Sequence, residues 1–142
     1  MLTFKRILFY IASFTWGIIM SLIGGVVMLI SLPFHRVKVW HGRAYAIWGK
    51  GWGGLELGCF FICGEDCQSE YLLAHESGHG LQNIILGPLM PFLVCIPSGI
   101  RYWYRELHYH RKGLTPPTSY DSIWFEGWAT KWGYRFIVTD RI

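Results

Sequence analysis

The amino-acid sequence predicts an α+β membrane protein, with an N-terminal transmembrane anchor over residues 1–36 and one membrane-associated domain over residues 37–142. Three observations favour this class. No charged residue occurs from Ile7 to Phe34, and this run exceeds the roughly 20 residues that a helix needs to span a bilayer. The stretch 55–62 is rich in apolar and aromatic residues, as a strand is. Two later segments carry start and stop signals typical of helices.

The apolar run indicates a retained transmembrane helix rather than a cleaved signal peptide. It is too long for the apolar core of a signal peptide, and Ser31–Phe34 lacks the small residues of a cleavage site. Two cationic residues precede the run and four follow it closely: Lys5 and Arg6, then Arg36, Lys38, Arg43 and Lys50. This asymmetry places the rest of the chain on the cytoplasmic side of the membrane.

A short β-hairpin or edge strand is expected between the anchor and the first helix of the domain. Residues 37–45 have the mixed polarity of an interfacial strand or loop, and four glycines between 49 and 54 mark a turn. The strand over 55–62 has two interpretations. It is an ordinary core strand, or its exposed edge pairs with an extended peptide backbone. The second interpretation makes four positions substrate-binding candidates: Leu55, Glu56, Leu57 and Gly58.

The most informative motif lies in the next segment, which predicts a helix from about 68 to 86, ended by Gly87-Pro88. It contains His75-Glu76-Ser77-Gly78-His79, which fits the pattern H-E-x-x-H. Residues four apart lie on one face of a helix, so both imidazoles can bind one Zn²⁺ ion. Glu76, between them, lies close enough to take a proton from an activated water.

The third metal ligand is expected on a helix that follows Tyr120. Its acidic residue is Glu126, and the small Ala129 one turn later would let this helix approach the histidine helix closely. Asp121 precedes the helix and is typical of an N-cap or of a group that orients a ligand. Tyr120 is a candidate donor to a developing oxyanion, with an interfacial aromatic as the alternative.

Residues 84–100 form a second apolar stretch, which three prolines interrupt. We expect a re-entrant or interfacial segment, because His79 before it and Glu126 after it must reach the same ion. Aromatic and basic residues alternate over 101–111, as in an interfacial anchor. His108 follows them and is either a further catalytic residue or, on base rates, a solvated loop residue.

The pattern H-E-x-x-H with a Glu on a later helix resembles the gluzincin metallopeptidases. The fuller run from His75 to Asn83, with Gly87-Pro88 and Ile96-Pro97-Ser98, looks like small bacterial membrane proteins with this motif. The resemblance implies a bacterial inner-membrane protein with His75, His79 and Glu126 as zinc ligands and Glu76 as general base. Many gluzincins also carry an Asp shortly after the ligand Glu, where this chain has Ala129 and Thr130, so the group that orients a ligand histidine is expected to be Asp121, Glu70 or a backbone carbonyl.

These observations favour a membrane-anchored zinc metallopeptidase that cleaves peptides or membrane proteins. The alternative is a non-catalytic membrane scaffold or interaction protein that keeps zinc as a structural clip. Two other classes are disfavoured, because six histidines are too few for a di-iron lipid oxidase and no nucleic-acid-binding pattern is present. The expected partners are the lipid bilayer and a peptide substrate, and oligomerisation could complete the pocket of so small a chain. The four cysteines favour buried thiols over a disulfide or a metal site.

Overall fold

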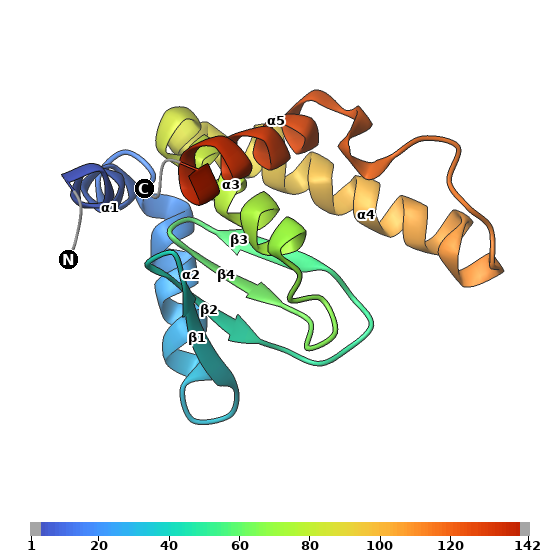
Figure 1. The fold of residues 1–142 in the computed structure, drawn as a ribbon, viewed down its shortest axis with the longest axis horizontal. Helices are drawn as coiled ribbons and strands as arrows, with labels where there is room; N and C mark the ends of the chain where they lie inside the picture. Colours follow the sequence, from blue (N-terminus) through green and yellow to red (C-terminus); the bar gives the residue numbers. More distant parts are fainter. Residues whose placement is uncertain (1–3, 140–142) are drawn as a thin grey trace.

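The computed structural model describes residues 4–139, and this part of the chain has an α+β fold. Five α-helices and four strands occur among the described residues, joined by short 3₁₀ and π segments. Figure 1 shows the sheet beside α2, with α3 crossing it and α4 and α5 beyond α3. The bounds are α1 Phe4–Phe14, α2 Ile18–Ser31, β1 Arg36–Trp40, β2 Arg43–Ile47, β3 Gly54–Leu57, β4 Phe60–Cys63, α3 Glu70–Leu86, α4 Ile96–His108 and α5 Trp124–Trp132.

The prediction of one long transmembrane helix is wrong, because the apolar run forms two helices bent by 97°. The corner is held by tertiary contacts with α3. Asn83 Nδ2 donates a hydrogen bond to the carbonyl oxygen of Gly17 at 3.1 Å, and Trp16 Nε1 donates one to the carbonyl oxygen of Ile85 at 3.2 Å. A Cβ atom on Gly17 would lie 2.4 Å from Asn83 Nδ2, so a larger residue at this corner would displace the Asn83 side chain that holds it. A glycine also weakens the helix locally, which makes the break inexpensive.

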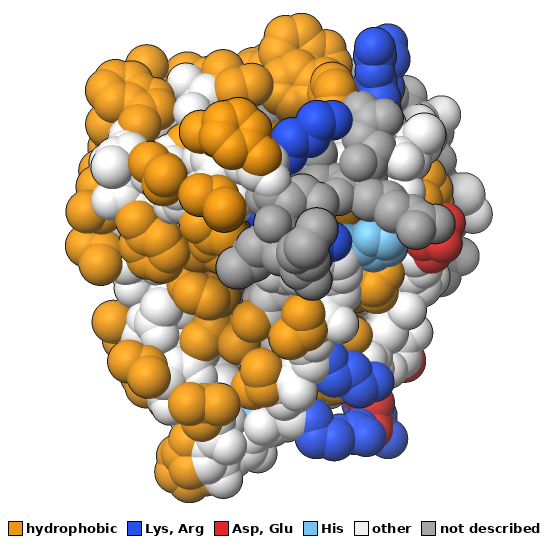
Figure 2. All heavy atoms as spheres, turned by 60° about the vertical axis from the view of Figure 1, so that its left-hand side comes forward, with side chains coloured by type: hydrophobic (Ala, Val, Ile, Leu, Met, Phe, Trp, Pro, Cys, Tyr) orange, Lys and Arg blue, Asp and Glu red, His pale blue; other side chains and the backbone are white. Residues whose placement is uncertain are grey.

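Among residues 4–139, none of the helices is by itself both long and apolar enough to cross a bilayer. Two bent pairs of helices reach the required length and composition when each pair is counted as one span. The first pair is α1 with α2, and the second is α3 with the helical stretch that ends at Lys112. The face that carries α1 and α2 is nonetheless covered by apolar side chains (Figure 2). Leu22, Val26 and Leu29 of α2 are each more than half exposed.

The sheet has the strand order β1-β2-β4-β3, so β3 is an edge strand. β1 and β2 form one antiparallel hairpin, β3 and β4 form another, and β2 pairs with β4 in parallel. Residues 55–62 are therefore a hairpin rather than the single strand that we expected. The chain reverses at Gly58, whose φ of +78° favours glycine, and a Cβ atom there would lie 2.5 Å from Ser21 N.

The two faces of the sheet bury different side chains. Ala46, Leu57 and Ile62 pack with Met20 and Met28 of α2. Tyr45, Phe61 and Cys63 point to the other face and pack against Leu73 of α3. This alternation follows from the two-residue period of a strand, and it clamps the sheet between α2 and α3. The histidine helix is thereby fixed on the sheet, with its polar residues directed towards β3 and α5.

The predicted interruption at 84–100 is a chain of short helical segments with a bend of 117° near Met90. α3 ends at Leu86 as predicted, and Gly87 has a φ of +54°. Pro88, Pro91 and Pro97 each occupy one of the first positions of a helical segment. A proline there sacrifices no helical hydrogen bond, so three prolines are compatible with a largely helical connection. This connection returns the chain over the site as α4.

Candidate metal centre

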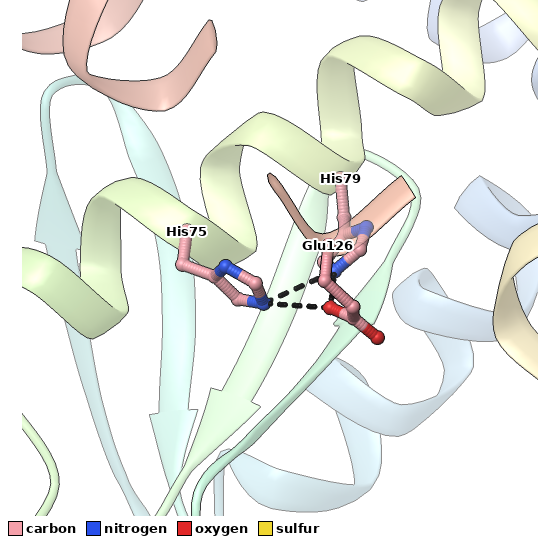
Figure 3. Close-up of side chains that lie close together, drawn as sticks. All are labelled: His75, His79 and Glu126. Carbon is pink, nitrogen blue, oxygen red and sulfur yellow. Dashed lines mark hydrogen bonds and ion pairs between the residues drawn. The ribbon is translucent and has the colours of Figure 1, made fainter. Parts of the chain in front are cut away.

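His75, His79 and Glu126 bring three ligand atoms together in the interior of the protein (Figure 3). The Nε2 atoms of the two histidines lie 3.2 Å apart, and Glu126 Oε2 lies 3.1 Å from His75 Nε2 and 3.0 Å from His79 Nε2. All three side chains are buried. The described residues therefore include a group that could hold a metal ion.

The triangle of ligand atoms has the size that a small tetrahedral ion requires. With bonds of about 2.0–2.1 Å from zinc to nitrogen or oxygen, two ligand atoms at the tetrahedral angle lie about 3.3 Å apart. The three sides of 3.0–3.2 Å are slightly shorter than this. Two imidazoles and one carboxylate also form the ligand set of catalytic zinc sites, which leave a fourth position open. The residues thus fit zinc in both chemistry and spacing.

Small residues let α5 approach α3 closely enough for Glu126 to reach the histidines. A Cβ atom on Gly78 would lie 1.8 Å from the carbonyl oxygen of Ala129, and one on Gly133 would lie 1.8 Å from that of Ala74. Ala74 and Ala129 are themselves fully buried. The predicted role of Ala129 in a close helix contact is confirmed, and the glycine of the H-E-x-x-H motif forms the other half of that contact.

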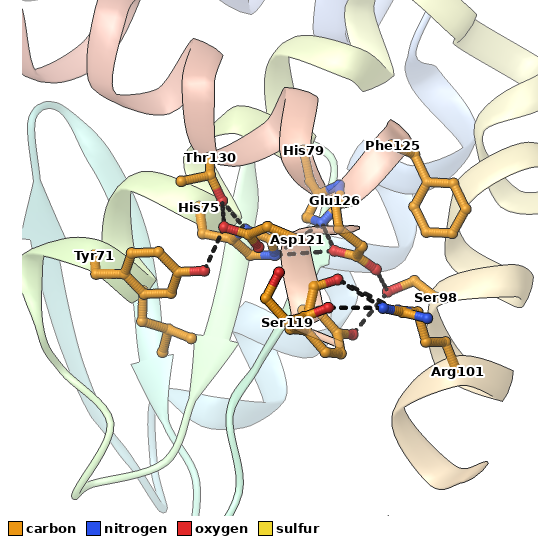
Figure 4. A network of polar contacts seen from close by, with 12 residues as sticks. Tyr71, His75, His79, Ser98, Arg101, Ser119, Asp121, Phe125, Glu126 and Thr130 are labelled. Carbon is orange, nitrogen blue, oxygen red and sulfur yellow. Dashed lines mark hydrogen bonds and ion pairs between the residues drawn. The ribbon is translucent and has the colours of Figure 1, made fainter. Parts of the chain in front are cut away.

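The ring of His75 is oriented by a relay through Thr130 to Asp121 (Figure 4). Thr130 Oγ1 donates its one proton to Asp121 Oδ2 at 3.0 Å. The same oxygen lies 2.8 Å from His75 Nδ1, so it must accept a proton from that nitrogen. Tyr71 Oη also donates to Asp121 Oδ2, at 2.7 Å. With Nδ1 protonated, the lone pair on His75 Nε2 is directed into the triangle.

The prediction that Asp121 helps to orient a ligand agrees with this relay, whereas the prediction for Glu70 does not. Glu70 is the exposed first residue of α3 and follows the N-cap Ser69, one and a half turns before His75. An Asp at position 130 is unnecessary, because Thr130 bridges the distance from His75 to Asp121. Sequence reasoning missed the role of Thr130. Its hydroxyl oxygen accepts the proton of His75 Nδ1 because its own proton is donated to Asp121, and this pairing depends on the tertiary structure.

His79 is oriented by Gln82, which the sequence analysis did not identify. Gln82 Oε1 lies 2.7 Å from His79 Nδ1, and Gln82 Nε2 donates to the carbonyl oxygen of Phe125 at 2.7 Å. The second bond fixes which end of the amide faces the imidazole, so Nδ1 of His79 is the donor and Nε2 is free to bind a metal. The sequence did hold one indication of this role, because Gln82 follows His79 by three residues and side chains at that spacing meet on a helix.

Glu126 and Tyr120 are tied to α4 by Ser98 and Arg101 (Figure 4). Ser98 Oγ donates to Glu126 Oε1, the oxygen that does not face the histidines, and lies 3.3 Å from Tyr120 Oη. Arg101 Nη2 donates to the carbonyl oxygens of Ser119 and Tyr120 at 3.0 and 3.1 Å. The guanidinium thus holds the turn that carries Tyr120 against the site. Neither Ser98 nor Arg101 was predicted as a site residue.

A cavity of about 470 Å³ opens beside the triangle and is lined by Glu76, Tyr120, the edge strand β3 and one face of α4. Of the four predicted substrate-binding positions, Leu55 and Glu56 line the cavity. Leu57 belongs to the core against α2, and Gly58 forms the hairpin turn, so neither reaches it. His108 is exposed at the end of α4, beside the carbonyl oxygen of Tyr104, and does not line the cavity, whereas His110 does.

Burial and mutual charge set the proton affinities of the site. Burial raises the pKa of Glu76 above its usual value. Burial alone would raise the pKa of Glu126, but the imidazoles of His75 and His79 beside its carboxylate outweigh it and hold that pKa well below the usual range. Burial lowers the pKa of His79, yet the neighbouring carboxylates, Glu126 first, more than offset this and raise it to about 9, so a metal ion that binds Nε2 must displace a proton from it. Burial also raises the pKa of Tyr120, which keeps its hydroxyl a donor.

The four cysteines are free thiols, of which Cys59 and Cys63 are buried as predicted, whereas Cys67 and Cys95 are only partly buried. Burial raises the pKa of Cys59 and of Cys63 to about 11, so these thiols are poor nucleophiles and poor metal ligands at neutral pH.

The chain was compared with protein-family models, with curated proteins and with solved structures, and no match was found in any of the three comparisons.

Proposed function

We propose that this protein is a membrane-associated zinc metallopeptidase. The observation that carries the proposal is the arrangement around the triangle of His75, His79 and Glu126. The triangle faces a cavity, Glu76 projects beside it, and an edge strand runs along the cavity wall. A structural zinc site usually closes with four protein ligands, whereas three are brought together here among residues 4–139.

A Zn²⁺ ion bound by these residues would supply a Lewis acid that polarises the peptide carbonyl and acidifies the attacking water. Glu76 would take the proton from that water and deliver it to the amine that leaves. A Cβ atom on Gly54 would lie 2.6 Å from Glu76 Oε1, so the carboxylate lies directly against β3. A peptide paired with the edge of β3 would therefore present its backbone to Glu76.

Tyr120 would donate its hydroxyl to the oxygen of the attacked carbonyl as negative charge develops there. Its hydroxyl lies close to Ser98, and its ring centroid lies 6.1 Å from that of His75. Burial of the phenol favours the neutral, donating form. Arg101 contributes by holding the backbone of Tyr120 in place. His108 has no part in this proposal.

The membrane part of the proposal rests on the exposed apolar side chains of α1 and α2. Ile11, Leu22 and Leu29 are each at least 55% exposed. So large an apolar surface is costly in water, and contact with lipid chains would remove that cost. Nearby cationic residues such as Arg36 and Lys38 would suit anionic headgroups. We therefore keep the proposed location in a bacterial inner membrane with the metal centre on the cytoplasmic side.

The test uses the full chain purified in detergent, with four proteins compared: wild type, Glu126→Gln, Glu76→Gln and the control Glu70→Gln. Elemental analysis should give one zinc per chain for all except Glu126→Gln, which should lose most of its metal. Cleavage of a quenched fluorescent peptide library should fall about 10²–10⁴-fold in Glu76→Gln, while Glu70→Gln stays close to wild type.

The outcomes separate the two candidate functions. Zinc that is lost in Glu126→Gln together with cleavage that is lost in Glu76→Gln would support the peptidase. Stoichiometric zinc with no cleavage by the wild type would instead favour the non-catalytic scaffold. An active Glu76→Gln protein would refute the assigned role of that residue.

A further inference from the structure

The cavity beside the metal centre has two unlike walls. One wall is β3 with Glu76, and the glycine of this strand, Gly54, is packed against Glu76. The other wall is one face of the helical stretch that leads into α4. The residues that form this second wall recur at helical spacing: Val94, Cys95, Ser98, Gly99, Tyr102 and Trp103. The metal ligands lie between the two walls.

Gly99 is an exposed position on the cavity-lining face of α4, and the space beside it is open. A Cβ atom built on it meets no heavy atom within 4 Å. Its backbone lies within the regular helix Ile96–His108 and has no positive φ. Neither packing nor conformation therefore requires glycine at this position. Glycine is also less favourable than alanine inside a helix, so its presence here costs some helix stability.

The space is apolar and lies next to the reacting centre. Met90 and Val94, which line the same cavity, are 0% and 1% exposed and belong to the hydrophobic core. Leu72 and Trp103 add further apolar lining. Ser98, the residue before Gly99, donates a hydrogen bond to the ligand Glu126. A group that occupies the space over Gly99 is thus within one residue of the metal-ligand shell.

We propose that the space over Gly99 is a specificity subsite that accepts a large apolar side chain, aromatic or long aliphatic, from the residue next to the scissile bond. This inference rests on the proposed function and names its substrate class. A large side chain there would cover the accessible apolar surface of Cys95 and Trp103, each one helical turn from Gly99, whereas an alanine would leave the space empty.

The first test compares kcat/KM for peptides that differ only in the residues flanking the scissile bond, with Ala, Leu or Phe at each position. Wild type should prefer Leu or Phe over Ala by about tenfold or more. Gly99→Phe should fill the subsite, lower kcat/KM for the Phe peptide at least tenfold, and leave the Ala peptide within about threefold of wild type. For Gly99→Ala, kcat/KM for the Phe peptide should lie between the values for wild type and for Gly99→Phe.

The matched control is Ile100→Phe, because Ile100 lies on the same helix and is 66% exposed. It adds an equally large ring away from the cavity and should leave the preference unchanged. Zinc content and thermal melting identify any variant that misfolds. A wild type without preference, or a uniform loss on all peptides in Gly99→Phe, would overturn the subsite.

A second measurement does not depend on turnover. N-acetyl-phenylalanine amide and N-acetyl-alanine amide are titrated into Glu76→Gln protein while the total tryptophan fluorescence is followed, to which Trp52 and Trp103 in the cavity lining contribute. The phenylalanine compound should bind about tenfold more tightly, and Gly99→Phe should abolish the difference. Binding preference without any cleavage would support the subsite and refute the peptidase. Equal binding by both compounds would refute the subsite even where peptides are cleaved.

Discussion

Two helix pairs in this molecule meet at glycines, yet they differ in which side chains they bury and which they leave exposed. Where α3 meets α5, histidine, glutamate, glutamine and threonine side chains are buried and joined by hydrogen bonds. Where α1 meets α2, the backbone corner is satisfied by Asn83, but large apolar side chains remain exposed. The buried polar side chains of the first pair bond to partners within the chain. The second pair leaves an apolar surface that the described residues do not cover.

The contact between α3 and α5 should respond most strongly to added volume. Gly78→Ala places a methyl group 1.8 Å from a backbone oxygen of Ala129, which cannot move without shifting α5. We expect a loss of about 3 kcal/mol in the free energy of unfolding, a melting temperature lower by about 10 °C, and weaker zinc binding. Differential scanning fluorimetry in detergent and elemental analysis provide the measurements.

Gly25→Ala on α2 is the matched control, since a Cβ atom there meets its nearest neighbour at 3.9 Å. It should leave the melting temperature unchanged or raise it slightly, because alanine is the better helix former. If both glycine variants lost the same stability, the contrast between the two helix pairs would be lost.

The relay from His75 should set metal affinity rather than stability. Thr130→Val keeps the shape of the side chain and removes the oxygen that accepts from His75 Nδ1. We expect zinc affinity to fall about 10–100-fold, as for other groups that orient metal-binding histidines. Competition with a fluorescent chelator measures this. Thr118→Val, at an exposed loop position, should match wild type. An unchanged affinity in Thr130→Val would show that Asp121 orients His75 without a bridge.

Arg101 should affect turnover while the metal stays bound. Arg101→Gln frees the turn that holds Tyr120, so we expect kcat to fall about tenfold with zinc content and KM little changed. In a Tyr120→Phe background the same substitution should have almost no further effect, because it acts through the phenol hydroxyl. Additive losses in the double variant would instead indicate a general structural role. Arg111→Gln, exposed beyond the end of α4, is the control.

The apolar surface of α2 should have the smallest effect on the metal centre. Replacing Leu22, Val26 and Leu29 together with serine should change the free energy of unfolding in detergent by less than about 1 kcal/mol and leave zinc binding intact. Flotation with vesicles of phosphatidylglycerol and phosphatidylcholine should nonetheless fall severalfold. Leu114→Ser, in an exposed loop outside this surface, should float like the wild type. Undiminished flotation of the triple variant would place the lipid contact elsewhere.

The same contrast explains which features the sequence could predict. His75, Glu76 and His79 were identifiable because their relation is local and follows from one helical turn. Glu126 was identifiable because acidic residues are scarce after His79. The bend at Gly17 was not, since it depends on Asn83, 66 residues later. The hairpin turn at Gly58 was hidden in a stretch that is rich in apolar and aromatic residues. The roles of Thr130 and Gln82 could be recognised only from the structure, which places helices far apart in the sequence side by side.

The bond from His79 to Glu126 joins residues 47 positions apart, and the relay from His75 to Thr130 joins residues 55 positions apart. Neither can form on a ribosome until α5 has left the exit tunnel, whereas α1 and α2 are complete long before. The apolar helices therefore emerge and find their surroundings while the histidines still lack their carboxylate. The three-residue group of His75, His79 and Glu126 can therefore form only after the apolar helices have been synthesised.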